Sequence, residues 1–167
     1  MRFQMEMVSV PESSLVAVFR LILAALFGAA VGINRELRAK PAGLRTHALV
    51  SLGAALLTLI GLALTNAGDP EGFGAASRVL QGLVAGVGFI GGGVILRREE
   101  SNEVHGLSTA ASIWIVAAIG VAAGCGLWMT SGAAVLLALG ILALGEPLDR
   151  LLRRRKKAEP PNVNAGG

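Results

Sequence analysis

Apolar residues along this chain gather in five long runs, each separated from the next by a short polar segment. In the 167-residue sequence the runs cover about 14–34, 46–64, 76–96, 107–122 and 127–144. An α-helix needs roughly 20 residues, at about 1.5 Å each, to cross the hydrocarbon core of a bilayer. The pattern therefore predicts an all-α, polytopic transmembrane helix bundle with about five spans. In the alternative with four spans, the last two runs form one re-entrant unit.

The composition supports a protein whose main partner is the lipid bilayer. Hydrophobic residues make up 53% of the chain and charged residues 16%, with 23 glycines and only 4% aromatic residues. Few bulky side chains and many glycines suit closely packed membrane helices. The net charge of +4 comes from basic residues near the ends of the runs, which indicates membrane topology rather than nucleic-acid binding.

The charges between the runs predict the orientation and the domain organisation. Basic residues mark segments 35–45 and 97–106 and the tail, whereas segment 65–75 carries Asp69 and Glu71 and no basic residue. By the positive-inside rule the N-terminus faces out and the C-terminus faces the cytoplasm. We expect an extracytoplasmic segment over 1–13, a membrane domain over 14–145 and a disordered basic cytoplasmic tail over 146–167.

Three polar side chains lie within the predicted spans near their outer ends, namely Arg20, Arg78 and Gln81. A charge at this depth needs a partner or water. One interpretation is an outer polar patch that lines a cavity, with acidic partners from Glu12, Asp69 or Glu71. The other is that the arginines anchor helix ends by reaching toward the membrane surface.

Glycines recur at four-residue spacing, which allows helix backbones to approach closely. The pairs are Gly28/Gly32, Gly82/Gly86, Gly88/Gly92 and Gly120/Gly124, and Gly91 and Gly93 add to the third run. Helix packing, within one chain or in a homodimer, is one interpretation. The other is a broken third helix whose freed carbonyls face a cavity and bind an ion.

A further polar group lies at the predicted cytoplasmic face. It is compatible with a docking surface, with a pH-responsive cluster built on two histidines, or with ordinary interface polarity. Two histidines without spaced acids do not make a metal site, and the chain has no catalytic triad, carboxylate dyad or zinc set. The members of this cytoplasmic-face cluster are Arg35, Glu36, Arg45, Thr46, His47, His105, Ser108 and Thr109.

Several of these residues stand in blocks that resemble the MgtC/SapB family of bacterial membrane proteins. The blocks are Arg20-Leu-x-x-Ala-x-x-x-Gly28-x-x-x-Gly32-x-x-Arg35-Glu36, Pro41-Ala-Gly-Leu-Arg-Thr-His47, Arg78-x-x-Gln81-Gly82, Gly86-Val-Gly-Phe-Ile-Gly-Gly-Gly-Val-Ile95 and Gly106-Leu-Ser-Thr-Ala-Ala-Ser-Ile-Trp114. Two positions depart from the family pattern: Asn34 stands where members often carry an acid, and Gly92 where alanine is usual. The chain resembles a short member without the family's C-terminal cytoplasmic domain.

The resemblance implies a multi-pass protein of the bacterial inner membrane, without a cofactor. It implies a non-enzymatic regulator, linked to magnesium limitation and stress adaptation, that contacts other inner-membrane proteins. A small transporter or ion pathway for an anion or Mg²⁺ is the alternative. Cationic side chains at the outer depth suit an anion better than Mg²⁺, which prefers several oxygen ligands.

Overall fold

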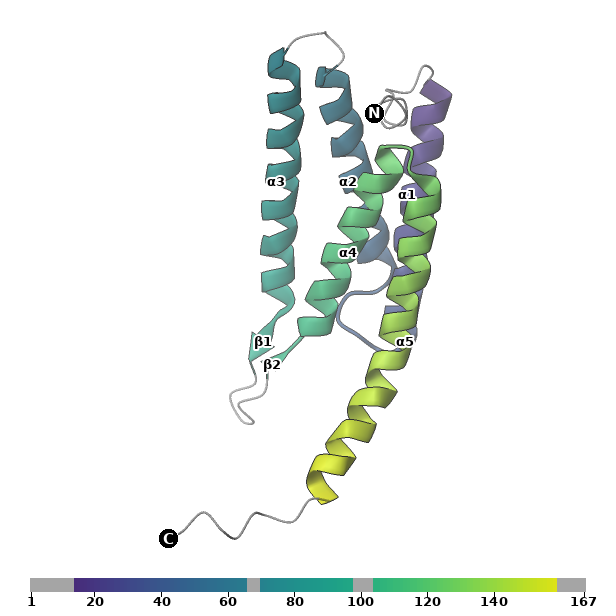
Figure 1. The fold of residues 1–167 in the computed structure, drawn as a ribbon, viewed down its shortest axis with the longest axis vertical. Coiled ribbons are helices and arrows are strands. Elements are labelled where there is room, and N and C mark those ends of the chain that lie inside the picture. The colour runs from purple at the N-terminus through teal and green to yellow at the C-terminus, as the bar shows by residue number, and fades with distance from the viewer. Residues whose placement is uncertain (1–13, 66–69, 98–103, 159–167) are drawn as a thin grey trace, which may run out of the picture.

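The bundle consists of five membrane-length helices, as the hydrophobic pattern predicts (Figure 1). The computed structural model describes residues 14–65, 70–97 and 104–158. The elements are α1 (Ser14–Leu37), α2 (Leu44–Thr65), α3 (Pro70–Val94), β1 (Leu96–Arg97), β2 (Val104–His105), α4 (Leu107–Gly124) and α5 (Trp128–Ala158). The four-span alternative is wrong, because α4 and α5 are separate helices, each long and apolar enough to cross a membrane.

Helices α1, α2 and α4 contact one another and form the centre of the bundle. Helix α3 packs on one side, against α2 and α4, and α5 packs on the other, against α4 and α1. Half of the α4 span is buried, against 11% of the α3 span. Figure 1 shows α3 at one edge of this arrangement and α5 at the other.

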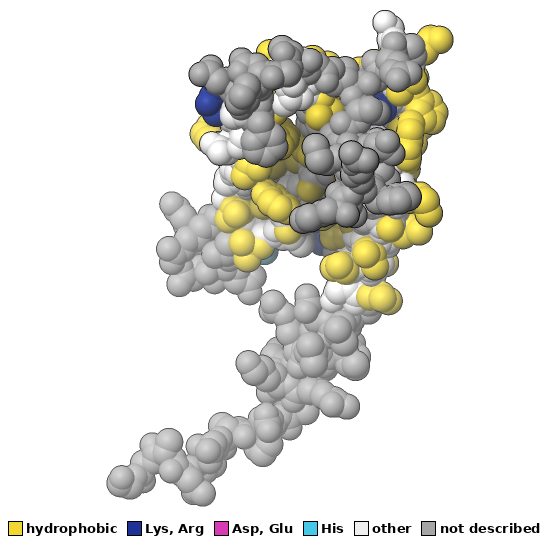
Figure 2. All heavy atoms as spheres, turned by 45° about the horizontal axis from the view of Figure 1, so that its top comes forward, with side chains coloured by type: hydrophobic (Ala, Val, Ile, Leu, Met, Phe, Trp, Pro, Cys, Tyr) yellow, Lys and Arg dark blue, Asp and Glu magenta, His cyan; other side chains and the backbone are white. Residues whose placement is uncertain are grey.

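The core is made of small and β-branched side chains, which let the helices pack closely. Val31, Val116 and Ile119 form one buried cluster, and Ala24, Ala55 and Ala123 form another. Many of the larger apolar side chains point outward instead. Figure 2 shows hydrophobic side chains over much of the described surface on the face that it draws. Examples that are more than two thirds exposed are Leu136, Leu137 and Ile141 on α5. Such a surface is stable in hydrocarbon and unstable in water.

Helix α3 is continuous from Pro70 to Val94, so the alternative interpretation of a broken third helix is wrong. Each glycine in a helix costs about 1 kcal/mol relative to alanine in water. In hydrocarbon, however, a break would leave N–H and C=O groups without partners, which costs several kcal/mol for each group. The membrane environment therefore keeps this glycine-rich segment helical.

Helix α5 continues past the end predicted near residue 144 and past Pro147, to Ala158. The disordered tail predicted for 146–167 is therefore helical over its first part, and 159–167 lie outside the described residues. The N-terminal segment 1–13, with Glu12, and Asp69 also lie outside them. Figure 1 shows α5 leaving the bundle at its C-terminal end.

A short antiparallel ladder joins α3 to α4, in a segment that the hydrophobic pattern leaves as a loop. Leu96 pairs with His105, and Arg97 pairs with Val104. The ladder places Gly106 at the start of α4 with φ +90°, where a Cβ atom would collide with the carbonyl oxygen of Val94. Only glycine meets both conditions.

Candidate functional site

A polar network, buried except at Ser108, joins α1, α2 and α4 at the end of the bundle where α4 begins. We call it the Arg35 network, and it consists of Arg35, His47, Ser108, Thr109 and Ser112. The guanidinium of Arg35 donates to Thr109 Oγ1 at 2.9 Å and to Ser108 Oγ at 3.3 Å. Arg35 is 1% exposed and lies in the last turn of α1, where the negative end of the helix dipole favours a cation.

His47 extends the network to α2. It is fully buried, with Nδ1 2.9 Å from the carbonyl oxygen of Gly43 and Nε2 2.9 Å from Ser112 Oγ. Because a carbonyl oxygen only accepts, Nδ1 carries a proton, and a neutral His47 then accepts at Nε2 from the Ser112 hydroxyl. Ser112 Oγ also lies 2.8 Å from the carbonyl oxygen of Thr109. Ser112 has one hydroxyl proton, so at any moment it donates either to His47 Nε2 or to the carbonyl oxygen of Thr109.

Glu36, near the end of α1, forms a hydrogen bond with the first residue of α2. Its Oε2 accepts from the backbone N–H of Leu44 at 2.9 Å, so it caps the N-terminus of α2 with a negative charge. Our sequence analysis placed Glu36 in a polar cluster but did not predict this capping role. The connection itself turns at Ala39, a residue with φ +51°.

The structure separates the remaining members of the predicted cytoplasmic-face cluster from this network. Arg45 and His105 are exposed, and Thr46 is half-buried. Ser112, which we did not predict as a site residue, belongs to the network instead of these three residues. Its spacing of three residues from Thr109 puts both on one face of an otherwise apolar helix, and that spacing is visible in the sequence. Among the described residues no group of three His, Cys, Asp or Glu side chains could hold a metal ion.

Arg20 occupies the other end of α4. It is 5% exposed, and its Nη1 donates to the carbonyl oxygen of Gly124 at 2.9 Å. Gly124 is the last residue of α4, so its carbonyl belongs to those that lack a partner within the helix. A cation at this end is also favoured by the helix dipole. Among the described residues Arg20 is therefore buried against the end of α4 and does not extend to the surface.

The turn between α4 and α5 is shaped around this arginine. Gly126 has φ +81°, and a Cβ atom there would lie 2.9 Å from Arg20 Nη2. Phe19 packs on Trp128, the first residue of α5, with ring centroids 5.2 Å apart. Burial raises the pKa of the Cys125 thiol in this turn, and the positive charge of Arg20 offsets part of that rise. Together Phe19 and Arg20 fix α1 to the start of α5.

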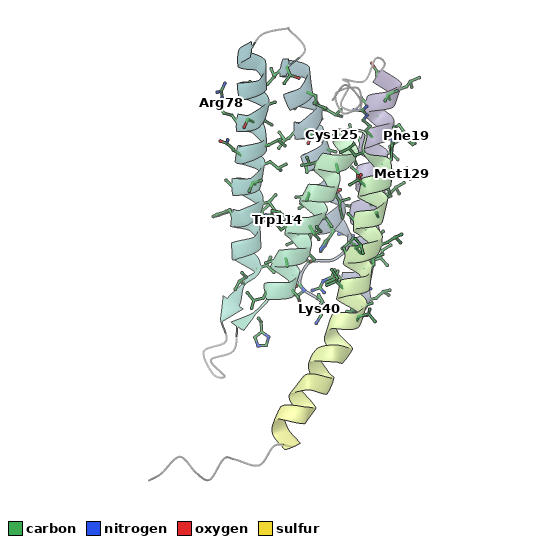
Figure 3. The ribbon with its side chains drawn as sticks, in the orientation of Figure 1. Phe19, Lys40, Arg78, Trp114, Cys125 and Met129 are labelled. Carbon is green, nitrogen blue, oxygen red and sulfur yellow. The ribbon has the colours of Figure 1, made fainter. Side chains whose placement is uncertain are left out.

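Arg78 and Gln81 do not join Arg20. Figure 3 shows Arg78 on α3, away from the turn where Cys125 lies. Both side chains are exposed, and Gln81 Nε2 donates to Ser77 Oγ at 3.3 Å. Arg78 lies at a groove between α3 and α2.

The predicted glycine pairs divide into two kinds. A Cβ atom at Gly28 would collide with the carbonyl oxygen of His47, and one at Gly32 would lie 2.6 Å from Leu44 Cα. Gly120 and Gly124 approach α2 in the same way. On α3, a Cβ atom would have nothing within 4 Å at Gly82, Gly86, Gly88, Gly92 and Gly93, and Gly91 has only ordinary contact with Ala110. Close packing within the chain therefore uses α1, α2 and α4.

The chain is similar to known proteins along most of its length. The family model described as "MgtC family" matches residues 21–151. The chain is 38% identical over 161 residues to Protein SrpB of Synechococcus elongatus, covering 87% of the chain and 88% of that relative. No solved structure matches the chain.

Two longer relatives match over a smaller share of the chain. The chain is 44% identical over 119 residues to "Putative magnesium transporter YhiD" of Escherichia coli K12, and 41% identical over 122 residues to Protein MgtC of Salmonella typhimurium. These matches cover 66% and 73% of the chain. The chain spans about half the length of each of these two relatives, 52% and 49%.

Proposed function

Because the chain belongs to the MgtC family of membrane proteins, we propose that it is a non-enzymatic regulator that binds other membrane proteins through one face of α3. In this proposal it resides in the bacterial inner membrane and acts under magnesium limitation and other stress. Its N-terminus faces out and its C-terminus faces the cytoplasm, because the basic segments lie on one side of an odd number of spans.

The observation that carries the proposal is the outward face of α3, defined by Gln81, Ala85, Gly88 and Gly92. All four residues are exposed, and their spacing of four, three and four places them along one side of the helix. At Gly88 and Gly92 a Cβ atom would meet nothing within 4 Å. Small residues on an open face let a partner helix approach closely.

The exposed polar side chain of Gln81 is a second reason to expect a partner helix. A glutamine amide has two donor hydrogens and an acceptor oxygen, and the described residues supply one hydrogen bond, from Nε2 to Ser77. In hydrocarbon the remaining groups need partners. A second membrane helix, packed on Ala85 and Gly88, would bring polar groups within reach.

Site-specific crosslinking in native membranes tests the proposal. In a C125A background, which removes the only native thiol, a single cysteine at Gly88 carries a photoreactive maleimide. We expect G88C to crosslink a distinct membrane protein, identified by mass spectrometry, and G92L in the same chain to abolish that product. The matched control is L136C, on the exposed side of α5.

Growth at low magnesium links the contact to function. We expect the wild-type chain and C125A, but not G92L, to restore growth of a strain that lacks the gene. Crosslinks only to a second copy of the chain, or equal products at Gly88 and Leu136, would count against a regulator and in favour of a homodimer or of random collision.

An ion pathway is the second candidate, and one observation favours it. Ser51 Oγ and Asn34 Oδ1 are buried and have no hydrogen-bond partner among the described residues. The Ser51 hydroxyl can donate to water or to an anion, whereas Asn34 Oδ1 only accepts and therefore suits water or a cation. The buried cation Arg35 favours an anion over Mg²⁺. Reconstituted vesicles that pass no anion, proton or Mg²⁺ under any gradient would eliminate this candidate.

A further inference from the structure

A long apolar groove runs between α2 and α3, on a different side of α3 from the outward face. Its volume is about 620 Å³, and its walls include Leu49, Gly53 and Leu57 of α2 and Gly82, Gly86 and Ile90 of α3. At Gly53, Gly82 and Gly86 a Cβ atom would meet nothing within 4 Å. The groove therefore exists because these positions carry no side chain. In a bilayer such a space fills with hydrocarbon, since water gains no polar partner from these walls.

The length of the groove matches one leaflet of the membrane. Twelve residues separate Arg78 from Ile90, which is about 18 Å along the helix at about 1.5 Å per residue. Half of the ~30 Å hydrocarbon core is about 15 Å. A single extended acyl chain would therefore run along the groove from the membrane surface to the bilayer centre.

Arg78 places a positive charge at one end of this apolar groove. Its side chain is exposed, and a Cβ atom at Gly74 would lie 3.5 Å from Arg78 Nη1. The guanidinium thus reaches back toward the N-terminal end of α3. Guanidinium groups bind phosphate through two parallel hydrogen bonds. The charge lies where the headgroup of a lipid would lie if its chain occupied the groove.

We propose that the α2–α3 groove binds an anionic phospholipid, with one acyl chain along Gly53, Gly82 and Gly86 and its phosphate paired with Arg78. An anionic lipid fits better than a zwitterionic one, because a zwitterionic headgroup carries its own ammonium to neutralise the phosphate. This binding is independent of the regulatory contact, which uses the outward face of α3.

Another groove of the same chain can be compared with the α2–α3 groove. A second groove, of about 260 Å³, lies between α3 and α4 and is lined by residues such as Leu80, Val84 and Trp114. None of the residues that line it is charged. Hydrocarbon can fill this second groove as well, but it offers no headgroup partner. Selectivity for an anionic headgroup is therefore expected to depend on Arg78.

Native mass spectrometry of the full chain tests the proposal. The protein is extracted in mild detergent and mixed with equal amounts of phosphatidylglycerol and phosphatidylcholine. We expect the wild type to retain phosphatidylglycerol about tenfold more often, which corresponds to about 1.4 kcal/mol. R78Q should reduce this preference to near unity, and R78K should keep part of it.

Two leucine variants on the same helix separate groove binding from general effects. G86L fills the groove and should lower retention of both lipids several-fold, whereas G88L, outside the groove, should leave retention unchanged. Circular dichroism melting confirms that each variant is folded, and G82A, a smaller change in the same groove, replaces G86L if that variant unfolds.

Three outcomes would overturn the proposal. One is a phosphatidylglycerol preference that persists in R78Q. Another is equal retention by G86L and G88L. The third is a dimer of the wild type that dissociates in G86L, which would show that a second copy of the chain occupies the groove. Loss of the G88C crosslink with normal lipid retention would contradict the regulatory proposal alone.

Discussion

Arg20 shows how a charged residue can be buried in a membrane helix when a backbone carbonyl accepts its hydrogen bond. Its guanidinium satisfies the last carbonyl of α4, at the end where the helix dipole is negative. We expect R20Q to lower the free energy of unfolding by about 2–3 kcal/mol, because a hydrogen bond to a charged group is lost in a buried turn. The measurement is an SDS titration of the purified chain in mixed micelles.

Arg78 provides the matched control for that prediction. It is also an arginine near the end of a span, but it is exposed. R78Q should therefore change the free energy of unfolding by less than about 0.5 kcal/mol in lipid-free micelles. Equal losses in R20Q and R78Q would mean that the Gly124 contact is not what makes Arg20 important.

Ala39 is strained by the turn that ends α1. Lys40 N–H donates to the carbonyl of Arg35 and Ala39 N–H to that of Glu36, which is the Schellman arrangement usually completed by glycine. An alanine in the left-handed conformation costs roughly 1–2 kcal/mol. Replacing it with glycine removes this cost, but glycine loses more conformational entropy on folding, which offsets part of the gain in stability. We expect A39G to raise the free energy of unfolding by about 0.5–1 kcal/mol in the same titration.

The opposite sign is expected for the same chemical change inside a helix. A48G in α2 should lower the free energy of unfolding by about 1 kcal/mol, because glycine is the poorer helix former. If A39G also destabilised the protein, the positive φ at Ala39 would not carry the strain that we assign to it.

The two arginines and the histidine of the buried polar sites could be selected from the sequence. The predicted cluster already grouped Arg35 with Ser108 and Thr109, but the sequence did not predict which hydrogen bonds form, nor the roles of Gly124 and Ser112. Arg20, Arg35 and His47 stand out because each is polar inside or beside an apolar run. Their hydrogen-bond partners lie 104, 74 and 65 residues away along the chain. Hydrophobic periodicity contains no information about such separations. We did not predict the positive φ of Ala39, because an alanine in a polar segment gives no sign of a left-handed conformation.

At the scale of the elements, the hydrophobic pattern predicted all five spans, because hydrocarbon forces long apolar runs into helices. It was least accurate where helices extend beyond the membrane. Helix α3 begins at Pro70 and α5 ends at Ala158, both in polar sequence that hydropathy does not assign to a span. The β1–β2 ladder was missed because two-residue strands have no recognisable period.

Glycine spacing alone did not distinguish packed pairs from exposed ones, and this difference is testable. A Cβ atom at Gly120 would collide with the carbonyl oxygen of Ser51 and lie 3.0 Å from Ala54 Cβ. We expect G120A to lower the free energy of unfolding by about 1–3 kcal/mol, because backbone cannot move aside cheaply. The measurement is again an SDS titration in mixed micelles.

Gly88 is the control. It has the same four-residue spacing to a second glycine as Gly120 has, but a Cβ atom at Gly88 would meet nothing within 4 Å. G88A should be neutral or raise the free energy of unfolding by up to about 1 kcal/mol, because alanine is the better helix former. Similar losses in both variants would show that α3 packs within the chain as closely as α4 does.

For the whole molecule, the order of spans does not reveal which helices are central. Helices α1, α2 and α4 share the close glycine contacts and the Arg35 network, whereas α3 and α5 lie at the edges. The two sides of the molecule consequently differ. The α3 side has grooves and an open small-residue face, and the exposed part of α5 presents large apolar side chains such as Leu136 and Ile141. This difference is why we propose α3 as the helix that binds the partner and the lipid.

The orientation of the bundle is the prediction on which the assignment of every site to a membrane face depends. The connection from α1 to α2 and the C-terminal part of α5 carry basic residues, and both lie at the same end of a five-helix arrangement. Cytoplasmic retention of lysine and arginine then places Arg20 and the α4–α5 turn near the outer surface. Reporter fusions after Asp69 and after Lys157 should be active on opposite sides of the membrane. Both reporters on one side would contradict five spans, and a reversed pair would place the Arg78 headgroup site in the cytoplasmic leaflet.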